Sequence, residues 1–143
     1  DFISAELEAV PAFNATDVGL DRSLIGSYGH DDRVCSYAAL KAMFDLDGAP
    51  TKTAVCIMAD KEEIGSEGVT GLRSEAYAAF LRDLCADAGV CDREAFRNSL
   101  CLSADVGGAY DPCYAEAYEA NNSCYIGKGV VVSKYTGSRG KGG

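Results

Sequence analysis

Residues 53–63 read TAVCIMADKEE, an unbroken apolar run followed at once by three acidic side chains. The seven residues from Thr53 to Ala59 are too few for a buried helix and include β-branched members, so they predict a buried strand. Asp60, Glu62 and Glu63 come directly after that strand. In open α/β sheets, ligands bind beyond the carboxyl ends of the strands. The stretch therefore predicts an α/β fold with a carboxylate-rich site at one edge of the sheet.

The rest of the chain alternates between strand and helix patterns. Further strands are predicted over Phe2–Val10, Leu100–Ala104 and Gly129–Tyr135, from short apolar runs bounded by turn residues. Apolar residues at helical spacing predict helices from about Asp31 to Leu46, over Ser74–Ala88 and over Asp92–Asn98. Asn14–Gly29 and Asp60–Gly71 are rich in Gly and polar residues and are predicted to be loops. This order favours one domain with a mixed β-sheet flanked by helices.

Composition excludes several classes of protein. The 143 residues are 48% hydrophobic and 24% charged, the balance of an ordinary globular domain. The formal net charge of −9 argues against a nucleic-acid or anionic-membrane partner, and no apolar run approaches the ~20 residues that cross a bilayer. The seven cysteines are odd in number and contain no CxxC pair, which favours a reducing cytoplasm. A secreted disulfide framework and a zinc–thiolate site remain alternatives.

The placement of the acidic residues is the main functional signal. Asp105 directly follows the predicted strand that ends at Ala104, and Asp31 and Asp32 open a predicted helix. Carboxylates gathered at one edge would repel one another, and a bound divalent cation would remove that repulsion. Lys61 or Arg33 could instead neutralise the cluster. The alternative for each acid alone is a helix cap, a solvated loop or a turn residue.

Other catalytic chemistry finds little support in the sequence. His30 is the only histidine, and catalytic zinc sites normally include at least one imidazole ligand. The chain has no phosphate-binding glycine loop and no GxSxG nucleophile motif. A Cys–His pair would have to use Cys35 and His30, which are near each other only in sequence. A carboxylate site for Mg²⁺ or Mn²⁺ in a phosphoryl-transfer enzyme would lack a cradle for the phosphates.

Four longer motifs occur in order: DVGLDRSLIGSYGHDDRVCSY at 17–37, TAVCIMADKEEIGSEGVTG at 53–71, LSADVGGAYDPCYAEAYEANN at 102–122 and GKGVVVSKYTGSRGKGG at 127–143. Together they resemble the aspartyl aminopeptidase / vacuolar aminopeptidase I family of zinc exopeptidases. The resemblance implies the α/β core of a zinc-exopeptidase (phosphorylase/hydrolase-like) catalytic domain. It also implies two Zn²⁺ ions per active site, with Co²⁺ or Mn²⁺ as possible substitutes, and removal of N-terminal, preferentially acidic, residues from peptides.

The resemblance also assigns roles to residues. Asp31 matches the aspartate that bridges the two metals, and Glu62 matches the general base. Glu63 and Asp105 match terminal ligands, one for each metal. Lys134 is a weaker candidate for binding an acidic substrate side chain, and a solvated lysine is the alternative.

The family has features that this chain lacks. Its two histidine ligands and its inserted dimerisation domain have no counterpart in residues 1–143, and His30 stands where relatives usually carry Gln. We therefore expect 1–143 to be a partial catalytic domain of a longer cytoplasmic protein that forms a large homo-oligomer and binds peptide substrates. The alternative is a non-catalytic fragment or assembly module, inactive when isolated.

Overall fold

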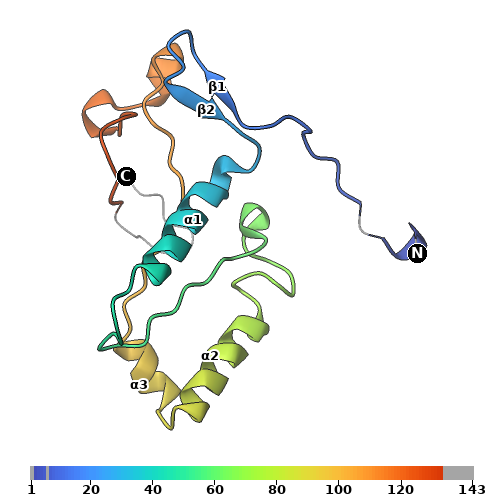
Figure 1. Ribbon diagram of the computed structural model, residues 1–143, viewed down its shortest axis with the longest axis vertical. Helices are drawn as coiled ribbons and strands as arrows, with labels where there is room; N and C mark the ends of the chain where they lie inside the picture. Colours follow the sequence, from blue (N-terminus) through green and yellow to red (C-terminus); the bar gives the residue numbers. More distant parts are fainter. Residues whose placement is uncertain (1, 6, 134–143) are drawn as a thin grey trace. The chain divides into compact units, whose positions relative to one another are not determined.

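The computed structural model describes residues 2–5 and 7–133, and these fall into two units, Asp1–Ala104 and Asp105–Gly143. The first unit contains, in chain order, η1 (Phe2–Ser4), β1 (Thr16–Val18), β2 (Leu24–Gly26), α1 (His30–Phe44), η2 (Glu62–Ile64), α2 (Glu75–Asp87) and α3 (Asp92–Arg97), as Figure 1 shows. The second contains two 3₁₀ helices, η3 (Pro112–Ala117) and η4 (Ala120–Asn122). This mixture of helix and strand agrees with the predicted α/β class.

The three predicted helices are confirmed. α2 ends where Gly89 adopts a left-handed conformation with φ of 67°, a common way for a helix to stop. α3 follows after a short turn and packs against α2. The Arg82 guanidinium of α2 lies 3.8 Å from Asp92 at the start of α3 and 3.6 Å from Glu75. These ion pairs are exposed, so each contributes at most about 1 kcal/mol.

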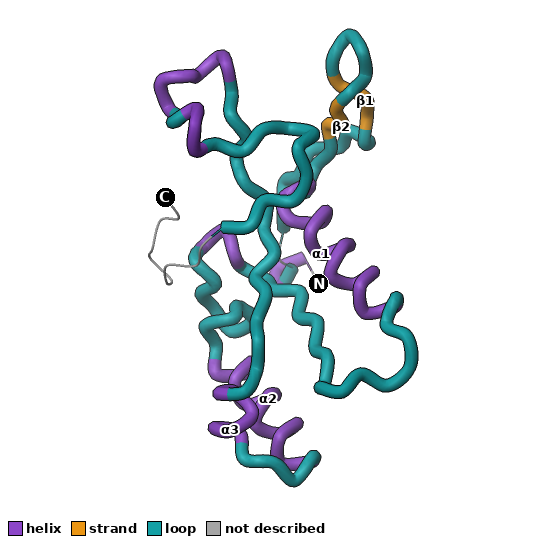
Figure 2. The backbone as a smooth tube through the Cα atoms, turned by 90° about the vertical axis from the view of Figure 1, so that its left-hand side faces the viewer, coloured by secondary structure: helices purple, strands orange, loops and turns teal. Residues whose placement is uncertain are grey.

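An antiparallel hairpin occupies part of the segment predicted to be a loop. β1 pairs with β2 in the register Thr16↔Gly26, Asp17↔Ile25 and Val18↔Leu24, and these strands are orange in Figure 2. In the turn between them, the Arg22 N–H donates to the Gly19 carbonyl at 3.2 Å. Hydrogen bonds from Ser23 lower the pKa of the Asp21 carboxyl in the same turn. The loop prediction for Asn14–Gly29 was therefore wrong for these two strands.

The predicted strands are not formed in the described residues. Phe2–Ser4 is a 3₁₀ helix, and 7–10, 53–59, 100–104 and 129–133 belong to no strand. The last two residues of the prediction Gly129–Tyr135 lie outside the described part. A strand is defined by hydrogen bonds to a neighbour, and these segments have no partner in the described part of the chain. One isolated parallel bridge joins Asp60 to Gly71, at the end of the predicted central strand.

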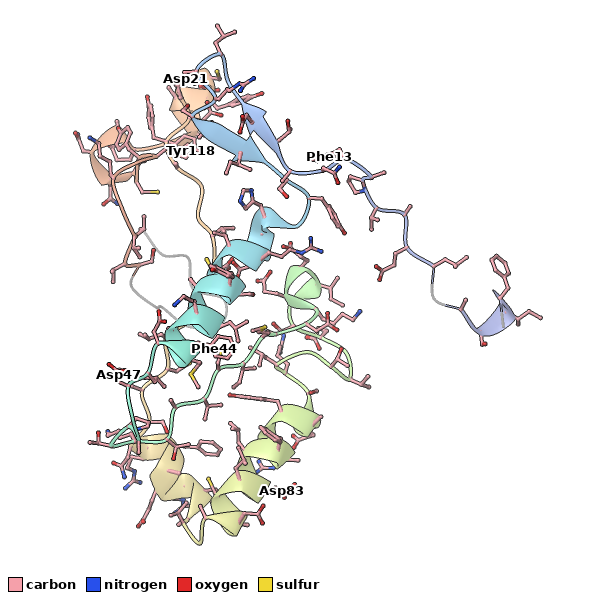
Figure 3. The ribbon with its side chains drawn as sticks, in the orientation of Figure 1. Phe13, Asp21, Phe44, Asp47, Asp83 and Tyr118 are labelled. Atoms are coloured by element: carbon pink, nitrogen blue, oxygen red, sulfur yellow. The ribbon has the colours of Figure 1, made fainter. Side chains whose placement is uncertain are left out.

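The apolar side chains of these segments face solvent. In these segments Val55 is 49% exposed and Leu102 is 86% exposed. Outside them, Phe44 at the end of α1 is 76% exposed as well, and its side chain is labelled in Figure 3. Across residues 2–5 and 7–133, no hydrophobic side chain is buried. The local elements are thus formed without a shared core. Within the same residues, no helix combines the length and the apolar character needed to cross a membrane.

The second unit is organised by its own short-range contacts. The Asp111 carboxylate caps η3 by accepting from the Cys113 N–H at 2.8 Å. The Tyr110 ring centre lies 5.6 Å from that of Tyr118 and 5.2 Å from that of Tyr125. The Tyr110 N–H also donates to the Cys124 carbonyl at 2.8 Å. These contacts fix the chain that follows Asp105.

Candidate metal centre

Asp31 and Asp32 lie at the start of α1 but depart from helical geometry. Asp31 has φ of −88° and ψ of 105°, Asp32 has φ of −125° and ψ of 42°, and the peptide bond between them is cis. The helix cap is Gly29, and the structure gives neither aspartate a capping hydrogen bond. The alternative interpretation of these aspartates as simple helix caps was therefore wrong. One Asp32 oxygen, Oδ1, is enclosed and has no hydrogen-bond partner among the described residues.

Of the two basic residues considered as neutralising partners, Lys61 pairs with Asp60, one of the clustered acids, and Arg33 contacts Tyr28. The Arg33 guanidinium lies 5.5 Å from the centre of the Tyr28 ring, and its Nη1 donates to the Tyr28 carbonyl at 3.4 Å. Lys61 Nζ lies 3.8 Å from Asp60 Oδ2. Within the described part of the chain, Asp31 and Glu63 have no ion pair. Their carboxylates are exposed, so their oxygens remain available as ligands.

Glu62 and Glu63 occupy the short 3₁₀ helix η2. This helix lies within a tight turn. Lys61 before it and Gly65 after it are both left-handed, with φ of 62° and 83°. The Gly65 N–H donates to the Glu62 carbonyl at 2.8 Å, and the Ser66 N–H donates to the Lys61 carbonyl at 2.8 Å. A left-handed lysine costs on the order of 1 kcal/mol, so the surrounding contacts must hold it in place. Strained backbone of this kind is concentrated at functional sites.

The loop that carries η2 is closed at its ends. Thr70 Oγ1 donates to Asp60 Oδ2 at 2.7 Å, beside the parallel bridge between Asp60 and Gly71. This hydrogen bond is the main reason that the pKa of the Asp60 carboxyl is lowered, with smaller contributions from the backbone N–H and the ammonium of Lys61. The Asp60 carboxylate is therefore ionised at neutral pH and already engaged.

Asp105 is the first residue of the second unit. Its Oδ1 accepts from the Val106 N–H at 2.7 Å, and its side chain is exposed. Asp31, Glu62 and Glu63 belong to the first unit, so the convergence of Asp105 with them stays a prediction. The expectation that Glu62, Glu63 and Asp105 follow the ends of two neighbouring strands was wrong for the described residues, because 53–59 and 100–104 form no strand there. Lys134, the candidate for substrate binding, lies outside the described residues.

Sequence reasoning missed the contacts that support the predicted site residues. Thr70 and Gly71 close the loop around Glu62 and Glu63, and Tyr28 holds Arg33 just after the two aspartates. These contacts join residues that are five to eleven positions apart, and no local pattern in the sequence signals them.

Comparisons with known proteins agree along the whole chain. The family model described as aminopeptidase I zinc metalloprotease (M18) matches residues 1–141. A probable M18 family aminopeptidase 1 from Clostridium acetobutylicum is 48% identical over 147 aligned positions, covering 100% of this chain and 31% of the relative. A protein of the same description from Thermotoga maritima is 44% identical and is covered over 32% of its length.

A solved structure supports the same relationship. The crystal structure of aminopeptidase I from Clostridium acetobutylicum matches with a TM-score of 0.76 at 46% identity, over 90% of this chain and 28% of that one. This likeness confirms the α/β class. The chain spans about a third of the length of the relatives it matches. The resemblance found in the sequence motifs is thus confirmed, and the chain belongs to the M18 family of aminopeptidase I zinc metalloproteases.

Proposed function

We propose that the full-length protein containing this segment is an aminopeptidase with two zinc ions that removes N-terminal, preferentially acidic, residues from peptides. The observation that carries the proposal is the family match over residues 1–141 together with the loop that presents two adjacent glutamates. In this proposal, residues 1–143 form part of the catalytic domain. The match to a peptidase family favours this function over phosphoryl transfer.

The donor groups fit divalent metal ions. Asp31 would bridge the two ions, and Glu63 and Asp105 would each complete the coordination of one of them. These carboxylates have no ion pair in the described part of the chain, so a cation would not have to displace a basic side chain. Three carboxylates are poor selectors for zinc on their own, because imidazole suits it better. Residues outside this segment would have to supply the nitrogen ligands.

The two adjacent glutamates would have different roles in the reaction, one as general base and one as metal ligand. When bound, the metal ions would polarise the scissile carbonyl and acidify the attacking water. Glu62 would accept a proton from that water and pass it to the departing amine. Glu63, on the next residue of η2, would hold a metal and take no proton. Lys134 would bind an acidic side chain of the substrate, and a solvated lysine remains the alternative role.

The cellular setting is part of the proposal. All seven cysteines are free, which supports a reducing compartment such as the cytoplasm. The exposed apolar segments support burial against further protein, within the full-length subunit and in a large homo-oligomer.

The second candidate function is that the isolated segment is only an assembly module. The absence of a buried hydrophobic side chain in the described residues favours that candidate for the segment alone.

Two glutamine substitutions in the full-length protein test the proposal. Glu62→Gln should keep its zinc but lose at least about 10²-fold in kcat, because a general base contributes about that much. Glu63→Gln should instead lower zinc content, since a neutral amide is a weaker ligand. The matched control is Asp83→Asn, which neutralises an exposed carboxylate on α2 and should change neither quantity (Figure 3). Full activity in Glu62→Gln would refute the proposal.

A further inference from the structure

The loop from Asp60 to Gly71 is tied at two places that lie on either side of η2. The first tie is the 2.7 Å hydrogen bond from Thr70 Oγ1 to Asp60 Oδ2, which we call the latch. The second tie joins the middle of the loop to the residues just after it, where the Arg73 N–H donates to the Ser66 carbonyl at 3.3 Å. Arg73 Nη1 also lies 2.7 Å from Glu67 Oε1. The loop is therefore closed by side chains as well as by backbone.

Close packing at Gly71 makes this closure sensitive to small changes. A Cβ atom at Gly71 would lie 2.0 Å from the Ser66 carbonyl oxygen, so the two backbone segments are in direct contact. Gly71 is also the one buried residue of the described chain. The isolated parallel bridge also pairs Asp60 with Gly71, so the two ends of the loop lie side by side.

The latch lies directly beside the residue from which the two glutamates follow. Lys61, directly after the latch residue Asp60, has a left-handed backbone that is unfavourable for a lysine. Such a conformation persists when the neighbouring contacts fix it. If the Asp60 end of the loop were released, Lys61 could relax, and Glu62 and Glu63 would rotate with it.

We propose that Asp60 and Thr70 are positioning residues, whose hydrogen bond orients η2 so that Glu62 can act as base and Glu63 can bind metal. The inference rests on the proposed function. Asp60 acts through the loop and not as a ligand, because its Oδ2 already accepts from Thr70 and lies beside the Lys61 ammonium.

The test compares two substitutions of one residue in the full-length, zinc-loaded protein. Thr70→Val keeps the shape of the side chain but removes the hydroxyl, whereas Thr70→Ser keeps the hydroxyl. Thr51→Val is the control, because Thr51 is an exposed threonine of the same unit that forms no hydrogen bond within the described residues. Asp60→Asn is a second way to weaken the latch while retaining an acceptor oxygen.

Each variant is measured for kcat, KM, zinc affinity and amide exchange. A displacement of about 1 Å at a catalytic group can cost about 10²-fold in rate, so Thr70→Val should lower kcat by tenfold or more. KM should stay near its original value. Zinc affinity should fall, and exchange should speed up at the Gly65 and Ser66 amides that close the turn. Thr70→Ser should restore all three properties, and Thr51→Val should change none.

Three results would overturn the inference. Thr70→Val with unchanged kcat and zinc affinity would show that the latch does not position the glutamates. Equal losses in Thr70→Val and Thr70→Ser would show that the hydroxyl is not responsible. Faster exchange at Gly65 and Ser66 without loss of kcat would show that the loop can loosen harmlessly. Failure of the proposed function is separate, since it would appear as full activity in Glu62→Gln while the exchange data still report on the latch.

Discussion

Replacing Gly71 by alanine places a methyl group where the structure has no space. The new Cβ would lie 2.0 Å from the Ser66 carbonyl oxygen, 2.5 Å from the Ser66 carbonyl carbon and 2.7 Å from the Glu67 carbonyl oxygen. Real Cβ atoms essentially never approach other atoms within 3.0 Å, so one backbone segment must move by about 1 Å. Gly71 has no positive φ, so the cost comes from the clash and not from the backbone conformation.

The expected effects are a modest loss of stability and a large loss of rate. Overpacking of this kind costs about 1–3 kcal/mol in unfolding free energy. A shift of about 1 Å in the loop that carries Glu62 should lower kcat about 10²-fold. Both are measured on the full-length protein, by thermal unfolding and by steady-state hydrolysis of a peptide with an acidic N-terminal residue.

Gly89→Ala separates stability from positioning. Gly89 follows α2 with φ of 67°, and no atom lies within 4 Å of the position that a Cβ would take, so alanine there strains the backbone by about 1 kcal/mol without any clash. This control should lower the unfolding temperature and leave kcat unchanged. Unreduced kcat in Gly71→Ala would refute the reasoning, because the loop would then tolerate the movement that the clash demands.

Three further outcomes are expected. Exhaustive chelation of the full-length protein should abolish peptide hydrolysis, and added Zn²⁺, Co²⁺ or Mn²⁺ should restore it; hydrolysis that survives chelation would contradict a metal mechanism. Residues 1–143 expressed alone should show no turnover, bind zinc weakly and self-associate. Turnover assays, zinc titration and sedimentation would check these three outcomes. Steady turnover by the pure segment would contradict the ligand assignment. Arg82→Met should lower the unfolding free energy by no more than about 2 kcal/mol, because it removes two exposed ion pairs worth at most about 1 kcal/mol each, and a larger loss in thermal unfolding would contradict that view.

The helices could be predicted from the sequence because their signals are local. Apolar spacing placed α2 within one residue at each end, and α3 began at Asp92 as predicted. The strands could not be obtained in the same way, since a strand forms only against a neighbour. Thr53–Ala59 has the composition of a buried strand, yet no partner for it occurs among the described residues.

For the β1–β2 hairpin the prediction failed in the other direction, because strands formed where a loop was predicted. Its strands are only three residues each, and the polar turn between Val18 and Leu24 dominated the composition of the segment. Apolar and β-branched residues on both sides of a Gly-containing turn were the signal that was available. For the site, the motif resemblance identified the family, but the contacts of Thr70, Gly71 and Tyr28 depend on how distant residues meet.

The closed loop has a consequence for how related sequences can differ in length. The alignment with the Clostridium relative spans 147 positions for a chain of 143 residues, so insertions and deletions do occur. An extra residue between Asp60 and Thr70 would break the ten-residue separation that lets their side chains meet. The connection after α1, which contains the exposed Asp47 (Figure 3), is joined to a distant segment by the 3.4 Å hydrogen bond from Lys52 Nζ to the Asn98 carbonyl, but among the described residues no side-chain hydrogen bond closes it on itself. Divergence in length should therefore accumulate in connections like residues 45–52 and spare the interval that holds the two glutamates.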